Sequence, residues 1–384
     1  TRQPSCQLTA KLSYWVQVRR RRKFGWSGAA VAGRGRATRE GRNLVETYTR
    51  TALEEASYQE ALERYYRDGG PVPHEFPEGF ESLSERVSAL KRERDAVVLA
   101  HYYVPADVQA LADYVGDSFY LARLACTLEA RVIVLCGVSF MGESVKLLNP
   151  SRTVLAPEPL ADCPMAHMVR KQDVDVARER FGDDLAVVCY VNSTAKIKAW
   201  SDVCVTSSNA IKVVRELPQG HILFIPDKNL GRYIARQVPE KRFILNEGFC
   251  PVHQGLDLEE VHLLRRDHPF AELLAHPECT EAVLAEADFI GSTKQIIERI
   301  VASARKEFIV LTEAGVQAQI ERLTAGQGKR VLYTKTPLLC PDMRMIRAEK
   351  LLRSLEEGYG EIALPDDAER ANAPLRRMLD LAVR

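Results

Sequence analysis

The chain has 384 residues, of which 46% are hydrophobic and 27% are charged, and its formal net charge is +1. These values are typical of a folded globular protein and argue against a fibrous or disordered chain. No apolar run reaches the ~18–20 residues that a membrane-spanning helix needs, so we expect no membrane contact. Nine cysteines at this length, none spaced as C-x-x-C, argue against a disulfide scaffold and favour the reducing cytoplasm.

The first 43 residues carry an excess of positive charge. They contain eleven lysines and arginines against one acid, Glu40, so this segment is +10 and the rest of the chain is −9. Such a segment suits a nucleic-acid or phospholipid arm, whereas its weak periodicity suits a disordered tail. We favour the disordered tail and expect no nucleic-acid partner. Residues 44–94 are predicted to form a helical lead-in, with its last helix at 82–94.

Three segments of the chain align without gaps at a spacing of roughly 88 residues. They are AHYYVPADVQALADYVGDS from Ala100, CYVNSTAKIKAWSDVCVTS from Cys189 and AHPECTEAVLAEADFIGST from Ala275. Their matched positions include Asp113, Asp202 and Asp288. A repeat of this length predicts three homologous domains.

Each repeat alternates apolar strand patterns with helical patterns. In the first repeat, residues 96–99 read as a buried strand and 106–112 as a short helix. A second strand is predicted at 132–135, 222–225 and 308–311, and a third at 152–155, 242–245 and 330–333. We therefore predict an α/β fold of three homologous three-layer αβα domains around a pseudo-threefold axis, with the active site at the centre. The domains are drawn at 95–165, 166–252 and 253–341, followed by a C-terminal helical segment at 342–384.

A cysteine followed by proline closes each repeat, at Cys163, Cys250 and Cys340. Because equivalent positions converge on a threefold axis, we expect the three thiolates to face one another, and Cys-Pro is common among iron–sulfur ligands. Three ligands leave one metal position open, where the metal can act as a Lewis acid. Buried apolar cysteines or a zinc site with three cysteines and one histidine are the alternatives. The cysteines predicted to be core or incidental are Cys6, Cys126, Cys136, Cys189, Cys204 and Cys279.

Other polar residues recur at equivalent positions near predicted strand ends, where α/β sheets place their sites. These are His101, Tyr190 and His276; Tyr103, Asn192 and Glu278 two residues later; and Ser118, Ser207 and Thr293 at predicted helix N-caps. Three hydroxyls at helix N-termini predict a small polyanionic ligand, with ordinary capping as the alternative. His253 follows Cys250 by three residues, which suits either an acid or ligand-polarising role or a hydrogen bond beside the metal.

Met141, Glu143 and residues 227–229 follow the second predicted strands and are further candidates, unless they lie in solvated loops. From these residues alone, the sequence predicts an iron–sulfur hydro-lyase or transferase that acts on a small anion. The alternative is a metal-dependent sensor or binding protein whose basic arm contacts nucleic acid.

Further strings lie between and after the aligned segments: GVSFMGESVKLLNPSRTVLAPEPLADCP, PDKNLGRYIARQ, GFCPVH and LCPDMRMI. With these strings, the chain resembles the quinolinate synthase (NadA) family from about residue 82 to the C-terminus. The resemblance implies a [4Fe–4S] cluster held by Cys163, Cys250 and Cys340. It also implies condensation of iminoaspartate with dihydroxyacetone phosphate to quinolinate, phosphate and water in NAD biosynthesis, with an aspartate oxidase or dehydrogenase as functional partner.

The same resemblance implies roles for the recurring polar residues. Glu278 is the implied general base, Tyr103 and Tyr190 act in isomerisation and dehydration, and His253 is catalytic. The implied substrate-binding residues are His101, Ser118, Asn192, Ser207, His276 and Thr293.

Overall fold

The structure is a computed structural model that describes residues 59–60, 62–65, 67, 70 and 76–383. The predicted basic tail and the first part of the predicted lead-in, residues 44–58, lie outside these residues. The last lead-in helix is confirmed as α3 (Phe80–Arg94), and the described residues belong to one compact unit. No helix of the described part of the chain is long and apolar enough to span a membrane.

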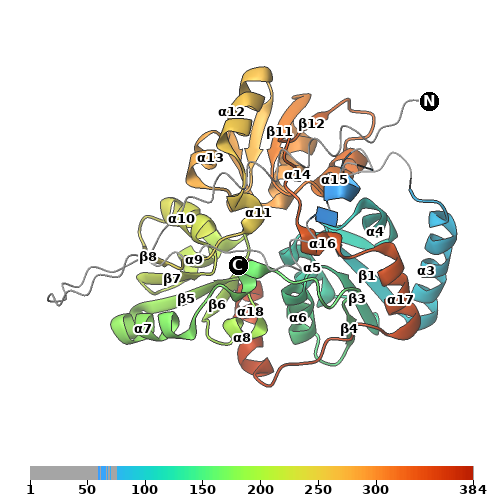
Figure 1. The fold of residues 1–384 in the computed structure, drawn as a ribbon. Helices are drawn as coiled ribbons and strands as arrows, with labels where there is room; N and C mark the ends of the chain where they lie inside the picture. The colour runs from blue at the N-terminus through green and yellow to red at the C-terminus, as the bar shows by residue number, and fades with distance from the viewer. Residues whose placement is uncertain (1–58, 61, 66, 68–69, 71–75, 384) are drawn as a thin grey trace, which may run out of the picture. The chain divides into compact units, whose positions relative to one another are not determined.

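Three repeats of strands and helices follow α3 (Figure 1). Repeat 1 contains β1 (Ala96–His101), α4 (Ala106–Leu111), β2 (Tyr114–Gly116), α5 (Ser118–Ala125), β3 (Val132–Cys136), α6 (Ser139–Leu148), β4 (Thr153–Leu155) and η1 (Pro164–His167). Repeat 2 contains α7 (Lys171–Phe181), η2 (Gly182–Asp184), β5 (Leu185–Tyr190), α8 (Ala195–Lys198), β6 (Val203–Val205), α9 (Ala210–Glu216), β7 (His221–Ile225), α10 (Lys228–Gln237), β8 (Arg242–Leu245) and α11 (Pro251–Gln254). Repeat 3 contains α12 (Leu258–Asp267), β9 (Glu272–Ala275), α13 (Glu281–Ala285), β10 (Phe289–Ile290), α14 (Thr293–Ala302), β11 (Glu307–Leu311), α15 (Val316–Leu323), β12 (Arg330–Leu332) and α16 (Pro341–Arg344), and α17 (Ala348–Glu357) and α18 (Ala368–Val383) complete the chain's helices.

The three sheets share one topology. Their strand orders are β2-β1-β3-β4, β6-β5-β7-β8 and β10-β9-β11-β12, and every pairing within them is parallel. The central strands are continuous apolar runs, such as VIVLC in β3, which is buried at all five positions. Such runs are expected where helices cover both faces of a parallel sheet. The predicted α/β fold of three repeats is confirmed, while the exact domain boundaries stay predictions.

Each sheet has a fourth strand that the sequence did not reveal. These strands, β2, β6 and β10, have two or three residues each, which is too short for a periodic signal. The recurring aspartates precede them: Asp113, Asp202 and Asp288 accept a hydrogen bond from the backbone N–H of the first strand in each repeat, at 2.7–2.9 Å. Each also pairs with a cation of the helix that precedes the first strand of its repeat: α3, α7 or α12. The repeated aspartate therefore fixes an edge strand and has a structural role.

Repeat 3 shows the three layers most clearly. Leu274, Phe308 and Val310 pack with α14 and α15 on one face of the sheet. Leu273 and Ile309, which alternate with them along the strands, pack with α12 and α13 on the other face. This alternation follows from the two-residue period of a strand.

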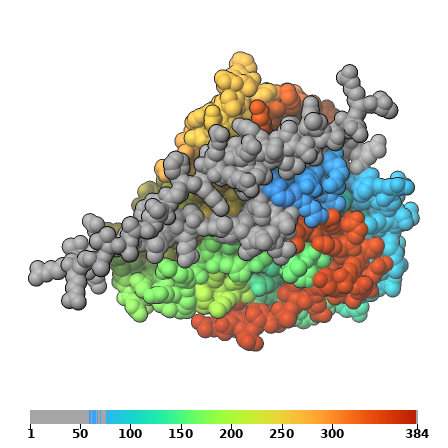
Figure 2. Space-filling model, viewed as in Figure 1, coloured from blue at the N-terminus to red at the C-terminus, as the bar shows by residue number. Residues whose placement is uncertain are grey.

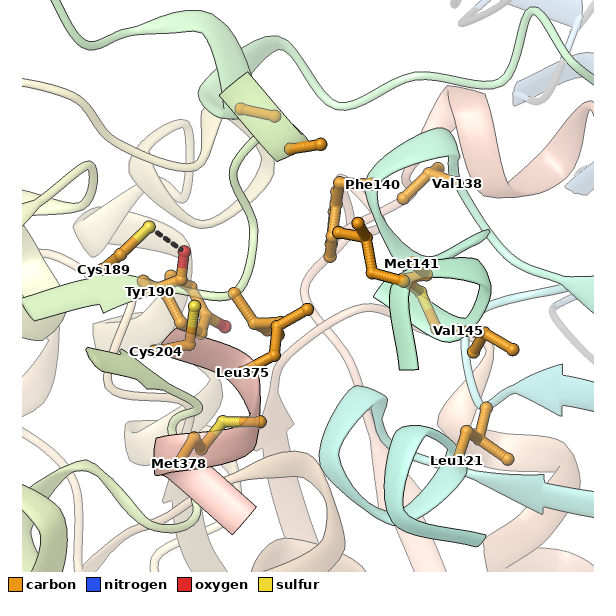
Figure 3. Packing of buried hydrophobic residues seen from close by; sticks show 14 of the residues in the cluster. Leu121, Val138, Phe140, Met141, Val145, Cys189, Tyr190, Cys204, Leu375 and Met378 are labelled. Atoms are coloured by element: carbon orange, nitrogen blue, oxygen red, sulfur yellow. Dashed lines mark hydrogen bonds between the residues drawn. The ribbon is translucent and has the colours of Figure 1, made fainter. Parts of the chain in front are cut away.

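Repeats 1 and 2 share a single core, which the C-terminal segment helps to build. Helix α17 packs on α3, and α18 packs on β6, α6, α8 and α9. Leu375 and Met378 of α18 lie beside Cys204 and Tyr190 (Figure 3). The C-terminal segment, red in Figure 2, accordingly lies against atoms of both repeats. Cys136, Cys189, Cys204 and Cys279 are buried core residues as predicted, whereas Cys126 is exposed and Cys6 lies outside the described residues.

Candidate active site and metal centre

One cavity, of about 970 Å³ including its mouth, is lined by residues of all three repeats. Strands β1 and β5 end at it, and β9 ends just before it. Every residue to which the family resemblance gave a role lines this cavity: Cys163, Cys250, Cys340, His101, Tyr103, Ser118, Tyr190, Asn192, Ser207, His253, His276, Glu278 and Thr293. The structure therefore brings together residues up to 239 positions from one another along the chain.

The three cysteines reach the cavity through the same local structure. Each is the N-cap residue of a short helix whose first position is proline: η1, α11 and α16. Proline suits this position because it has no N–H to leave unpaired. Cys163, Cys250 and Cys340 are free thiols.

Burial raises the pKa of all three thiols, and for Cys163 the neighbouring Cys340 raises it further. Thiols in such surroundings lose their protons when a metal ion is bound, because the cation replaces the missing solvation. Three soft thiolate donors, one from each repeat, fit a metal centre that leaves one coordination position open.

His253 and Glu278 form the polar centre of the site. His253 Nδ1 lies 2.8 Å from Glu278 Oε2 and 3.3 Å from Cys250 Sγ. The Tyr190 hydroxyl donates to Glu278 Oε1 at 2.6 Å. Burial alone would raise the pKa of Glu278, but His276 and the hydrogen bonds from His253 and Tyr190 lower it to about 2. Glu278 is therefore an ionised carboxylate that holds two donors.

Thr312, which the sequence reasoning missed, connects His253 to Tyr103. Its Oγ1 lies 3.1 Å from His253 Nε2 and 3.0 Å from the Tyr103 hydroxyl, which lies 2.8 Å from Thr293 Oγ1. Because Glu278 can only accept, His253 Nδ1 carries the proton and Nε2 accepts from Thr312. A continuous chain of hydrogen bonds thus runs from Thr293 through Tyr103, Thr312 and His253 to Glu278.

His101 and His276 occupy equivalent positions and are held in the same way. The backbone N–H of Tyr103 donates to His101 Nδ1 at 3.2 Å, and that of Glu278 donates to His276 Nδ1 at 3.3 Å. Burial lowers the pKa of both histidines to about 3. Both are therefore neutral, with the proton on Nε2, which in His276 lies 3.3 Å from Ser207 Oγ.

The N-cap prediction for the three hydroxyl residues was wrong. Ser118 and Thr293 are the first residues of α5 and α14, whose N-caps are Asp117 and Ser292, while Ser207 lies three residues before α9. The preceding side chains perform the capping in α5 and α14. As a result, the hydroxyls of Ser118 and Thr293 are not used as helix caps.

Two of the further candidates lie away from the cavity. Met141 is buried in the core, and Glu143 accepts the backbone N–H of Ala195 at 2.8 Å. Asp227 and Asn229 are buried rather than solvated, and Asn229 Nδ2 donates to the backbone carbonyl of Glu278 at 3.1 Å.

Thr312 and Glu313 were missed because repeat 1 has Gly137 and Val138 at the same positions. A polar pair directly after the buried run Phe308–Leu311 was the signal that could have revealed them.

Both nitrogens of His253 have partners, which favours a hydrogen-bonding role over metal ligation. The atoms that Cys250, His253 and Glu278 offer nevertheless lie within 4.8 Å of one another, so this group is compatible with a bound metal ion. The fold and this cavity, with thiols, an ionised carboxylate and linked tyrosines, are those of an enzyme of small-molecule chemistry whose site fits a metal centre.

The family model described as quinolinate synthetase A protein, NadA, matches residues 85–380. The chain belongs to this family. It is 47% identical over 301 residues to the quinolinate synthase of Fusobacterium nucleatum, covering 78% of this chain and 99% of the relative. Similar matches are the quinolinate synthases of Caldicellulosiruptor saccharolyticus (43% over 303 residues, 79% and 99% covered) and Aquifex aeolicus (40% over 311 residues, 79% and 96% covered).

Proposed function

We propose that this chain is a quinolinate synthase of NAD biosynthesis, which condenses iminoaspartate with dihydroxyacetone phosphate and releases phosphate and water. The observation that supports it is the meeting of three equivalent cysteines with Glu278, Tyr103 and Tyr190 in one cavity of a member of this family. We further propose a cytoplasmic enzyme with a [4Fe–4S] cluster on Cys163, Cys250 and Cys340, supplied with iminoaspartate by an aspartate oxidase or dehydrogenase. Free thiols as ligands suit a reducing compartment.

The cavity has to bind negatively charged substrate groups without cationic side chains, because no lysine or arginine is among the described residues that line it. Carboxylates and phosphate are therefore bound by neutral donors: the hydroxyls of Ser118, Ser207 and Thr293 and the Nε2–H groups of His101 and His276. The positive ends of α5 and α14, which begin at Ser118 and Thr293, add to this attraction.

Proton transfer is assigned to Glu278 and the hydrogen-bond chain behind it. When bound, the cluster supplies a Lewis-acidic iron that binds substrate oxygen or nitrogen and assists loss of water. Glu278 is ionised and accepts a carbon-bound proton of the substrate. Tyr103 is the acid at the other end of the chain and gives its own hydroxyl proton; return of a proton from Glu278 to Tyr103 requires that His253 first carry its proton on Nε2 instead of Nδ1, so that Nε2–H donates to Thr312.

The test of this function is chemical analysis followed by an assay, after strictly anaerobic purification. About four iron and four sulfide per chain, with bleaching in air, are expected of a [4Fe–4S] protein, together with quinolinate formation from the two substrates. About one zinc and no sulfide would leave the fold standing and overturn the cofactor assignment, and a loaded cluster without quinolinate formation would overturn the reaction.

Thr312→Val is expected to lower kcat by about tenfold to a hundredfold, because valine keeps the shape but breaks the proton path between Tyr103 and His253. Thr312→Ser keeps the hydroxyl and should restore most of the turnover. The measurement is kcat and KM across pH for both variants. Equal kcat for the valine variant and the unchanged chain would remove Thr312 from the proton path.

Deletion of residues 1–43 is expected to leave kcat and KM within about twofold of the full chain, because the family match begins at residue 85. Steady-state kinetics on both chains provides the comparison. A full chain without turnover that retains DNA, and loses that retention when residues 1–43 are removed, would favour the sensor hypothesis instead.

A further inference from the structure

We propose that Asp227 is a positioning residue for the metal centre: one of its carboxylate oxygens fixes the turn that presents Cys250, and Glu313 does the same for Cys340. The inference rests on the proposed function, since it takes both cysteines as ligands of the iron–sulfur cluster. Neither carboxylate is among the residues to which the family resemblance gave a role.

The backbone near each cysteine is held by an equivalent hydrogen bond in all three repeats. The turn that follows the second central strand meets the turn that precedes the cysteine through one hydrogen bond of 2.8 Å. The bonds are Ser139 N to Ala161 O, Lys228 N to Gly248 O, and Ala314 N to Leu338 O, each ending two residues before a cysteine. In repeat 2 the approach is close enough that a Cβ on Gly248 would stand 2.6 Å from the carbonyl oxygen of Pro226.

In repeats 2 and 3, the residue just before the donor also accepts a hydrogen bond from the backbone N–H of the cysteine. In repeat 2 this residue is Asp227, which is fully buried. Its Oδ1 caps α10 by accepting the backbone N–H groups of Asn229 and Leu230 at 2.8 and 2.9 Å. Its Oδ2 accepts the backbone N–H of Cys250 at 3.2 Å. The two oxygens of one side chain thus have separate tasks.

Glu313 is the equivalent residue in repeat 3 and is also fully buried. Its Oε2 accepts the backbone N–H of Gly315 at 2.6 Å, just before α15. Its Oε1 accepts the backbone N–H of Cys340 at 3.2 Å and the Arg344 guanidinium at 2.8 Å. As in Asp227, one oxygen binds the start of the following helix and the other binds the cysteine N–H; in Glu313 the second oxygen also accepts from Arg344.

Repeat 1 provides an informative exception. Val138 stands at this position and offers no acceptor, yet the backbone N–H of Cys163 still donates to a carboxylate, Oδ1 of the adjacent Asp162, at 2.7 Å. Ser139 donates to the same oxygen. The location of the carboxylate has changed between repeats, but the acceptor for the cysteine N–H is present in all three. Because a carboxylate accepts the cysteine N–H in every repeat, its role is to hold the cysteine and not to hold the end of the strand.

The physical effect is preorganisation. Burying a carboxylate costs free energy unless the group is hydrogen-bonded, and here some of its hydrogen bonds come from the backbone N–H groups of the proposed ligand residues. Holding the N–H of Cys250 and Cys340 fixes the direction of each Cα–Cβ bond before metal is bound. Groups that orient metal ligands in this way typically change metal affinity by 10–100-fold when removed.

The test separates the two oxygens of Asp227. Asparagine keeps one oxygen to cap α10 but places an NH2 group opposite the Cys250 N–H, and serine caps the helix but is too short to reach Cys250. We expect Asp227→Asn and Asp227→Ser to lose iron to a chelator about tenfold to a hundredfold faster than the unchanged holoprotein, with altered cluster absorption. Asp257→Asn is the matched control, because Asp257 caps α12 and bonds only to Glu259 N in the same manner.

Glu313→Gln distinguishes geometry from charge. A glutamine can keep its oxygen where Cys340 N and Arg344 converge, so the negative charge is lost while the acceptor remains. We expect iron loss close to that of the unchanged chain. Fast loss in Glu313→Gln with slow loss in both Asp227 variants would overturn the inference.

Two further outcomes are decisive. If the unchanged chain holds iron and sulfide and both Asp227 variants release iron at its rate, the positioning role is wrong while the proposed function stands. If the unchanged chain holds no cluster, the proposed cofactor and this inference fail together. Thermal unfolding of each variant identifies any that fail to fold. If one Asp227 variant fails, the rate of iron loss from the other one tests the positioning role.

Discussion

Replacement of Cys163, Cys250 or Cys340 by alanine is expected to remove nearly all bound iron and all turnover. In the proposed assignment each thiol is the single ligand that its repeat contributes, so its loss would leave two thiolates, which cannot hold the cluster. His253 is poorly placed to substitute, because both of its ring nitrogens already have hydrogen-bond partners. Iron and acid-labile sulfide per chain after anaerobic purification, with quinolinate formation, give the measurement.

Cys204→Ala is the matched control for these three variants. Cys204 belongs to β6 and lies in the core near Leu375 and Met378 of α18 (Figure 3), and it is not among the residues that line the cavity. Its replacement removes a small buried group and is expected to reduce stability modestly while iron content stays unchanged. Equal iron retention in all four variants would contradict the ligand assignment.

Glu278→Gln is expected to retain the full iron content and to lower kcat by about a hundredfold to ten-thousandfold, which is the range for loss of a general base. Glutamine has the same shape and can still accept from Tyr190 or His253, so the cavity should persist. It cannot accept a proton at neutral pH. The measurement pairs iron analysis with steady-state kinetics on one preparation.

Glu281→Gln, three residues further on, makes the same chemical change outside the cavity. Glu281 is half-exposed and pairs with Arg232 and Arg236 of α10. Exposed ion pairs contribute little to stability, so this variant should match the unchanged chain in both measurements. Normal turnover in Glu278→Gln would exclude Glu278 as the base, and a parallel loss in both variants would point to a structural effect.

The sequence predicted the repeat, the parallel sheets and the residues that meet at the cavity, because these depend on patterns that occur three times. Strand β3 is an uninterrupted apolar run, and Cys163, Cys250 and Cys340 stand in register. Features that occur only once, or that depend on placing a helix start to within one residue, could not be predicted from the sequence. Ser118 was taken for an N-cap that is in fact Asp117, since both residues are good caps and only the backbone geometry separates them.

The proton path was missed for a related reason. Thr312 has glycine and proline at the equivalent positions of the other repeats, so the repeat pattern conceals it. Its importance arises from two partners, Tyr103 and His253, that come from other parts of the chain. Only the folded arrangement places them within hydrogen-bond distance.

The packing of α18 has a consequence for synthesis of the chain on the ribosome. This helix follows all three repeats in the sequence, yet it covers β6, α6, α8 and α9 of repeats 1 and 2. The apolar surface that Leu375 and Met378 bury therefore stays uncovered while about 160 residues, which include the whole of repeat 3, are translated. The proposed metal centre needs Cys340 of repeat 3, so cluster insertion would follow the translation and folding of that repeat.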